Sequence, residues 1–191
     1  MVPEASLEQT DCGRIAAGDG WFVLNARDAI WFDRKGRGFG AVLERRGGFD
    51  QLGISLDVLG PGEPMAMYHW EADQEDFLVL SGNATLIIEG EERKLRQWDL
   101  VHCPPGTAHV IVGGPCVVFG VGSRERHTMI ADDGTRTGRP DWGEYVGHPA
   151  AQKYGAASAA TTTSAEEAYA RFPASELTRY GGWLPSFDPD G

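Results

Sequence analysis

The sequence predicts an all-β protein in which many short strands form one barrel or jelly roll. The chain has 191 residues, of which 41% are hydrophobic, and this size suits one compact domain with its own core. Its 26 glycines and 11 prolines favour tight turns between short strands. Apolar stripes with helical spacing are scarce, whereas short apolar runs bounded by turn residues recur along the chain.

The first segment, residues 1–49, reads as a lead-in that packs on the barrel. Residues 1–20 are polar and punctuated by glycine. Short strands are expected at Trp21–Leu24 and Ala29–Phe32, before a glycine-rich turn at Gly36–Gly40.

The second segment, residues 50–122, is the predicted barrel. Gly82 and Asn83 indicate a tight turn, and the run from Ile87 to Glu92 is typical of a hairpin centred on Gly90. The strands expected here are Gly53–Leu59, Asp76–Leu80, Ala84–Glu89, Glu92–Leu95, Leu100–Cys103, His109–Val112 and Val117–Val121.

The third segment, residues 123–191, is a C-terminal extension. Ala150–Ser164 is rich in Ala, Thr and Ser and resembles a linker. Ser164 is a suitable N-cap for a short helix over Ala165–Arg171. Apolar residues beyond it are expected to pack on the barrel or on a neighbouring subunit: Phe172, Leu177, Tyr180, Trp183 and Leu184.

Composition narrows the function classes. The formal net charge of -11 disfavours nucleic acid and anionic membrane surfaces as partners. No stretch approaches the roughly 20 apolar residues of a membrane helix. Three cysteines at no metal-like spacing, and an N-terminus without a secretory pattern, indicate reduced thiols in a soluble, cytoplasmic protein.

Four residues with metal-binding side chains stand out: His69, Glu71, Glu75 and His109. His69 and Glu71 are two apart, so on a strand both side chains point to the same face. Glu75 opens the next strand, and His109 begins another after a Pro-Pro-Gly turn. Imidazole nitrogens and carboxylate oxygens together suit Mn, Fe, Co, Ni or Zn.

The spacing of these residues resembles the cupin family, whose motifs run G-x5-H-x-H-x3-4-E-x6-G and G-x5-P-x-G-x2-H-x3-N. The first motif matches at His69, Glu75 and Gly82, with Glu71 in place of the second histidine, and the second matches at Pro104, Gly106 and His109. The opening glycine of the first motif is displaced to Gly60 or Gly62. Trp98 and Gly113 replace the second motif's first glycine and final asparagine. The resemblance covers roughly residues 50–122 and implies a double-stranded β-helix.

The resemblance implies one divalent ion, Fe, Mn, Zn or Ni, held by His69, Glu75 and His109. Glu71 is either a fourth ligand or a catalytic base beside the metal, and its carboxylate makes the site harder. A metal-dependent enzyme acting on a small polar molecule is expected, with dioxygenase-type oxidation favoured because a His/His/carboxylate set suits non-haem Fe(II). A metal-assisted isomerase or lyase, and a non-catalytic small-molecule binding or sensing protein, remain alternatives.

Neighbouring residues complete the predicted site. Phe77 shares the strand face of Glu75 and is expected to line the pocket, and Tyr68 flanks it. His102 is a catalytic acid/base candidate if its side chain faces the barrel interior, while Cys103 reads first as core packing. A homodimer is the expected assembly, because exchange of terminal segments would cover exposed sheet edges.

Overall fold

The computed structural model describes residues 1–124, 129–130, 136–137, 141–182 and 184. The strands are β1 (Ser6–Thr10), β2 (Gly13–Ala17), β3 (Ile30–Asp33), β4 (Phe39–Val42), β5 (Leu52–Leu59), β6 (His69–Glu71), β7 (Glu75–Ile88), β8 (Glu91–Arg96), β9 (Leu100–Cys103), β10 (His109–Ser123), β11 (Met129–Ile130), β12 (Arg136–Thr137), β13 (Gly143–Tyr145) and β14 (Glu176–Thr178). The helices are α1 (Pro149–Gln152) and α2 (Ala165–Tyr169). The predicted all-β class is confirmed.

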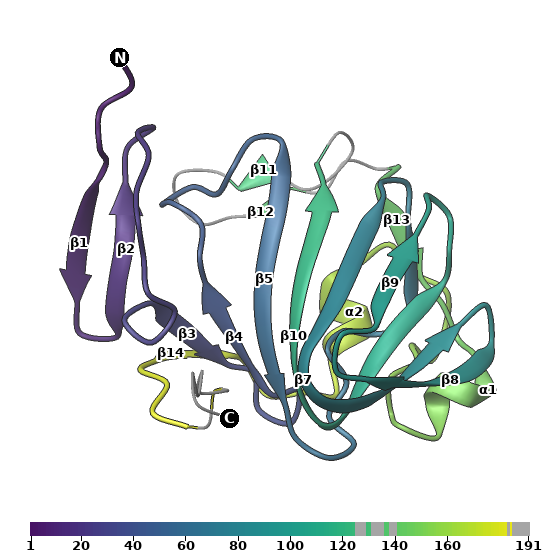
Figure 1. Cartoon of the computed structure of the whole chain (residues 1–191). Helices are drawn as coiled ribbons and strands as arrows, with labels where there is room; N and C mark the ends of the chain where they lie inside the picture. Colours follow the sequence, from purple (N-terminus) through teal and green to yellow (C-terminus); the bar gives the residue numbers. More distant parts are fainter. Residues whose placement is uncertain (125–128, 131–135, 138–140, 183, 185–191) are drawn as a thin grey trace.

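Two long antiparallel strands, β7 and β10, organise the barrel (Figure 1). The first half of β7 pairs with β9 and the second half with β8. On its other side β10 pairs with β5 through its second half and with β6 at its first residue. Because both long strands pass from one half of the barrel to the other, a single ten-stranded sheet curls into the predicted jelly roll.

The turn expected at Gly82 and Asn83 is wrong, because both residues lie inside the continuous strand β7. Gly82 has a φ of 77°, and the register with β10 shifts between Gly113 and Cys116. A Cβ on Gly82 would lie 2.1 Å from the carbonyl oxygen of Pro115. Between the pairs of Gly113 and Cys116, β10 has one residue more than β7, and the glycine lets β7 continue past this bulge instead of ending in a turn.

The hairpin predicted around Gly90 is confirmed between β7 and β8, where Ile88 pairs with Glu91 across two loop residues. These loop residues, Glu89 and Gly90, have φ values of 49° and 80°. Two positive φ angles in a two-residue loop match the right-handed twist of the flanking strands.

Both flanking segments contribute strands to the sheet. From the lead-in, β3 and β4 pair with each other and β4 continues onto β5. From the extension, β14 pairs with β3 and β13 pairs with β6. The strand predicted at Trp21–Leu24 is wrong, since only Trp21 in this range makes an isolated bridge. Residues 1–20, where no strand was predicted, instead contain the hairpin of β1 and β2. The three segment boundaries stay a prediction.

The apolar residues of the extension pack on the sheet only in part. Phe172, Tyr180 and Leu184 pack against core clusters, whereas Leu177 is 53% exposed, contrary to the prediction. Tyr180 stacks on Trp31 with 4.5 Å between ring centroids, while Trp183 lies outside the described residues. Ser164 caps α2 by accepting a hydrogen bond from the Glu167 amide, as predicted. The linker-like stretch holds α1, whose Ala151 is fully buried. Among the described residues, no helix is long and apolar enough to cross a membrane.

Candidate metal centre

Three strands bring His69, Glu75 and His109 together at one end of the barrel interior. His69 begins β6, Glu75 begins β7 and His109 begins β10, where it stands opposite His69 in the register. Their donor atoms all lie within 4.8 Å of one another, so the group could hold a metal ion. The Nε2 atoms of His109 and His69 lie 3.3 Å and 3.7 Å from Glu75 Oε2. We call these three residues the donor triad.

Two atoms of the donor triad are buried without a hydrogen bond. His109 Nε2 and Glu75 Oε2 each have less than 1 Å² of exposed surface and no hydrogen-bond partner among the described residues. They face each other at 3.3 Å. When His109 is neutral, both atoms present only lone pairs, and a shared cation, either a proton or a metal ion, would satisfy both at once. The residues present therefore fit a divalent ion.

The second nitrogen of each imidazole sets the ring's orientation. His69 Nδ1 lies 2.7 Å from the Met67 carbonyl oxygen, and His109 Nδ1 lies 3.0 Å from that of Thr107. Since a carbonyl oxygen only accepts, Nδ1 carries the proton in each ring. In the neutral ring the lone pair is then on Nε2, which faces the donor triad. Metal-binding histidines are usually held in this way.

The surroundings of His109 change its pKa strongly. Burial lowers the pKa of the imidazole, but the Cys103 thiol and the Glu75 carboxylate outweigh burial and raise the pKa to about 10. Cys103 is buried and stands opposite Glu75 in the register of β7 and β9. In the absence of a metal, negative charge at this position therefore favours a cation on His109.

Glu71 lies beside the donor triad without belonging to the group of mutually close donors. Its Oε1 is 3.3 Å from His69 Nε2, and the residue is 8% exposed. Its backbone carbonyl accepts a hydrogen bond from Gly106 in the loop before β10. The carboxylate thus contacts one histidine of the triad, and its role as a fourth ligand or as a base stays a prediction.

Aromatic side chains surround the two histidines. Phe77 is buried, and its ring centroid lies 5.4 Å from that of His109, while its place in a substrate pocket stays a prediction. The ring centroids of Tyr145 and Trp142 lie 5.7 Å and 6.3 Å from that of His69. These last two were missed in the sequence, because they reach the site through the pairing of β13 with β6 and carry no local motif.

Tyr68 was predicted to flank the pocket, and this is wrong. Its neighbour His69 points into the barrel, so Tyr68 points to the opposite face of the chain. There it packs against Ala151 and Ala156, and its hydroxyl accepts a hydrogen bond from the Gly90 amide. Tyr68 supports the outer wall.

His102 does not meet the condition on which a catalytic role was expected. Along β9, Val101 and Cys103 are buried, whereas His102 is exposed on the outer face. Its Nδ1 lies 2.6 Å from Asp76 Oδ1, and 54% of its side chain is accessible to solvent. Because the imidazole faces away from the barrel interior, the condition for a catalytic role of His102 is not met.

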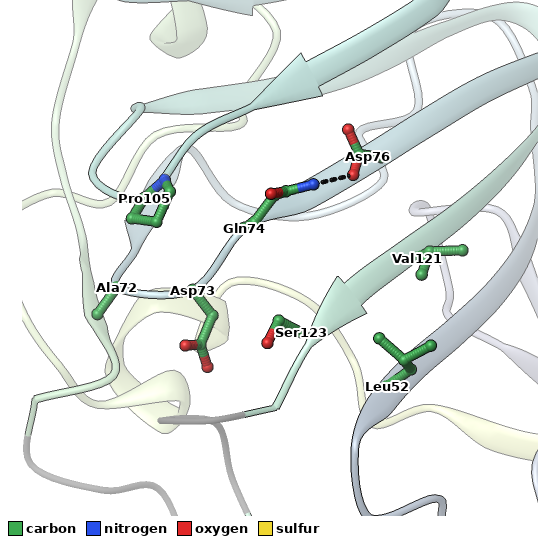
Figure 2. Close-up of a pocket in the computed structure, with 8 residues that line it drawn as sticks. All are labelled: Leu52, Ala72, Asp73, Gln74, Asp76, Pro105, Val121 and Ser123. Carbon is green, nitrogen blue, oxygen red and sulfur yellow. Dashed lines mark hydrogen bonds between the residues drawn. The ribbon is translucent and has the colours of Figure 1, made fainter.

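A hollow of about 470 Å³ opens beside the turn between β6 and β7. Figure 2 shows its lining, with the hydrogen bond of 2.5 Å that Gln74 donates to Asp76. The lining residues are Leu52, Ala72, Asp73, Gln74, Asp76, Pro105, Val121 and Ser123. Gln74, which precedes Glu75, lines the hollow, but no residue of the donor triad does. The chemistry expected of the triad is therefore not placed in this hollow.

Comparison with known proteins adds a family to this geometry. Residues 55–122 match the model of the family described as Cupin domain. No curated protein matches the chain.

Solved structures similar to this chain include three from bacteria. A polyketide cyclase from Streptomyces resistomycificus is 18% identical, with a TM-score of 0.47, over 54% of this chain and 79% of that chain. An RmlC-like cupin from Shewanella frigidimarina is 18% identical, with a TM-score of 0.46, over 54% and 90%. A putative sugar phosphate isomerase from Acidithiobacillus ferrooxidans is 25% identical, with a TM-score of 0.39, and the match covers 46% of this chain and 65% of that chain.

Proposed function

Because residues 55–122 match the Cupin domain family, we propose that this chain is a metal-dependent enzyme acting on a small polar molecule. His69, Glu75 and His109 would hold one divalent ion. The observation that carries the proposal is the convergence of donor atoms from His69, Glu75 and His109, which all lie within 4.8 Å of one another.

The donor set favours oxidation of the substrate as the reaction. Two imidazoles and one carboxylate with open positions are the arrangement that non-haem Fe(II) enzymes use to activate dioxygen. Three protein ligands leave room for substrate, as catalytic metal sites require. Metal-assisted isomerisation or elimination uses the same open positions without dioxygen.

The chain's own residues supply the rest of the chemistry. Glu71 is proposed as the base that takes a proton from the substrate, since its carboxylate is buried next to His69 and outside the group of mutually close donors. Phe77 and Tyr145 flank the two histidines with aromatic rings, which would keep bulk water away from the reacting atoms.

Elemental analysis of the purified protein, followed by oxygen uptake over a panel of small polar compounds, tests this function. The proposal expects about one iron per chain and substrate-dependent oxygen consumption. Tightly held zinc without oxygen uptake would remove the oxidative version, and turnover under nitrogen would favour an isomerase or lyase. Stabilisation by a ligand without any turnover would contradict the enzyme proposal and support a binding protein.

The Glu71→Gln variant separates the base from the ligands. We expect it to keep the metal and to lose most of its turnover, about 10²–10⁴-fold for a general base. A loss of metal from this variant would instead make Glu71 a ligand.

A further inference from the structure

The outer face of the sheet carries apolar side chains where an antiparallel barrel is usually polar. Along β10 the side chains alternate, with Val118 in the cluster of the barrel interior and Val117 and Phe119 in the cluster on the opposite face. An antiparallel sheet with one face in water alternates apolar and polar residues. The run Val117–Val121 is instead apolar on both faces, which is typical of a strand that is covered on both sides.

Two rows of residues cross this outer face over β9, β7, β10 and β5. Residues directly opposite each other on neighbouring strands share a face. The register gives a first row of Leu100, Leu78, Phe119 and Leu56, and a second row of His102, Asp76, Val121 and Ile54. Leu52 continues the face at the start of β5, opposite Ser123 (Figure 2). We call the two rows and Leu52 the outer apolar face.

One end of the outer apolar face is covered and the other is exposed. Leu56 is only 8% exposed and packs in a cluster with Trp31, on which Tyr180 stacks. At the opposite end of the same row Leu100 is 68% exposed, and Leu52 is 46% exposed. Large apolar side chains that stay exposed on one continuous face mark a site of association with another molecule.

The charge of the outer apolar face suits a second copy of this chain. Asp76 is the one acidic residue of the two rows, and its Oδ1 lies 2.6 Å from His102 Nδ1. The chain as a whole has a formal charge of -11, so two copies repel each other at long range. They can associate where apolar contact outweighs this repulsion, and a face with a single paired carboxylate meets that condition.

The shape of the region also suits contact with an identical face. A hollow of about 610 Å³ is lined by Phe119 and Ile54 of the two rows and is bordered by the lead-in residues 20–24. Within that lead-in segment Trp21 is 53% exposed and Val23 is 77% exposed. In a two-fold dimer the same surface meets itself, so a surface with both a hollow and projecting side chains can interlock with its copy.

We propose that the outer apolar face joins two copies of this chain in a symmetric dimer. With Trp21 and Val23, its exposed side chains offer on the order of 500 Å² of apolar surface, while a stable interface buries about 800 Å² per partner, about 60% of it apolar. The area is therefore sufficient without an exchange of terminal segments. The inference does not depend on the metal centre.

Sedimentation velocity of the full-length protein from low to high micromolar concentration tests the interface. Leu100→Glu should weaken the wild-type dimer about 100-fold or more, because the contact would desolvate an unpaired carboxylate. Leu177→Glu is the matched control: this leucine of β14 is 53% exposed and stands opposite Phe32, on the other face of β3 from Trp31. It should associate like the wild type. Added salt should not weaken the dimer, since salt screens the repulsion between the acidic chains.

Hydrogen exchange of the wild type at low and high concentration gives a second measurement that needs no variant. Amides of β9, which in the described part of the chain pairs only with β7, should gain protection as the concentration rises, and those of β14 should not. A dimer that Leu100→Glu leaves intact, that Leu177→Glu breaks or that salt dissociates would overturn the proposal. A wild type with a single chain mass throughout would overturn it as well, and protection of β9 in that monomer would assign the face to another segment or a different partner.

Discussion

Metal binding at the donor triad should release a proton from His109, and this coupling gives the affinity a steep dependence on pH. The raised pKa of about 10 means that His109 is a cation at neutral pH when no metal is bound. A metal ligand must be the neutral imidazole, so binding displaces that proton. Below pH 10 each unit of pH should therefore change the apparent affinity about tenfold, or ~1.4 kcal/mol. Between pH 6 and pH 8 the increase is about 100-fold.

The sign of the effect on stability follows from the same pKa. A histidine whose folded pKa lies above its ordinary value of 6.5 stabilises the metal-free protein below about pH 6.5. That contribution is lost as the pH rises through about 10. The increase in Tm on adding metal should therefore grow from pH 6 to pH 9, because the metal replaces a proton that becomes less available.

Competition with a chelator, using Zn²⁺ as the probe at several pH values, measures this dependence. Calorimetry in buffers of different ionisation enthalpy counts the protons released at pH 7. A slope near one and release of one proton attributable to His109 are expected. An affinity that levels off above pH 6.5 would refute the reasoning, because an unperturbed histidine would then be neutral throughout that range.

Three other predictions concern single features of the chain. His102→Ala should leave metal affinity and its pH dependence unchanged, since His102 faces away from the triad; a tenfold loss in chelator competition would return it to the site. Gly82→Ala should lower the free energy of unfolding by about 1–3 kcal/mol in chemical denaturation, and by more than Gly62→Ala does. Both glycines have positive φ, but only at Gly82 would the new Cβ meet a carbonyl oxygen, that of Pro115. Equal losses would contradict the bulge. The homodimer stays a prediction, for which light scattering should give twice the chain mass of 20.7 kDa, and a single chain mass would exclude it.

Local sequence patterns predicted the parts of the fold that depend on local chemistry. The hairpin at Gly90 needs two positive φ angles, and the sequence supplies glycine where the second one occurs. Ser164 could likewise be recognised as a helix cap, because capping depends on the side chain of the residue just before the helix. At Gly82 the local signal misled, since a glycine permits positive φ both in a turn and in a bulge, and only the pairing of β7 with β10 decides between them.

The candidate site also contains residues that a local pattern predicted and residues that no local pattern could predict. His69, Glu75 and His109 follow a spacing along the chain, and the structure brings these three together. Tyr145 does not follow one, because it meets the site through the pairing of β13 with β6, far from the triad in sequence. The orientation of His102 could not be predicted from the residue itself, because the face of β9 on which it lies depends on the strand's register with β7.

The most direct test of the metal centre is a titration of the chelated full-length protein with a divalent metal. The wild type should bind one equivalent per chain. His69→Ala, Glu75→Gln and His109→Ala should each weaken binding by at least tenfold, while His102→Ala should match the wild type. Tight binding that persists in all three triad variants, or no binding by the folded wild type, would contradict the assignment of the metal to His69, Glu75 and His109.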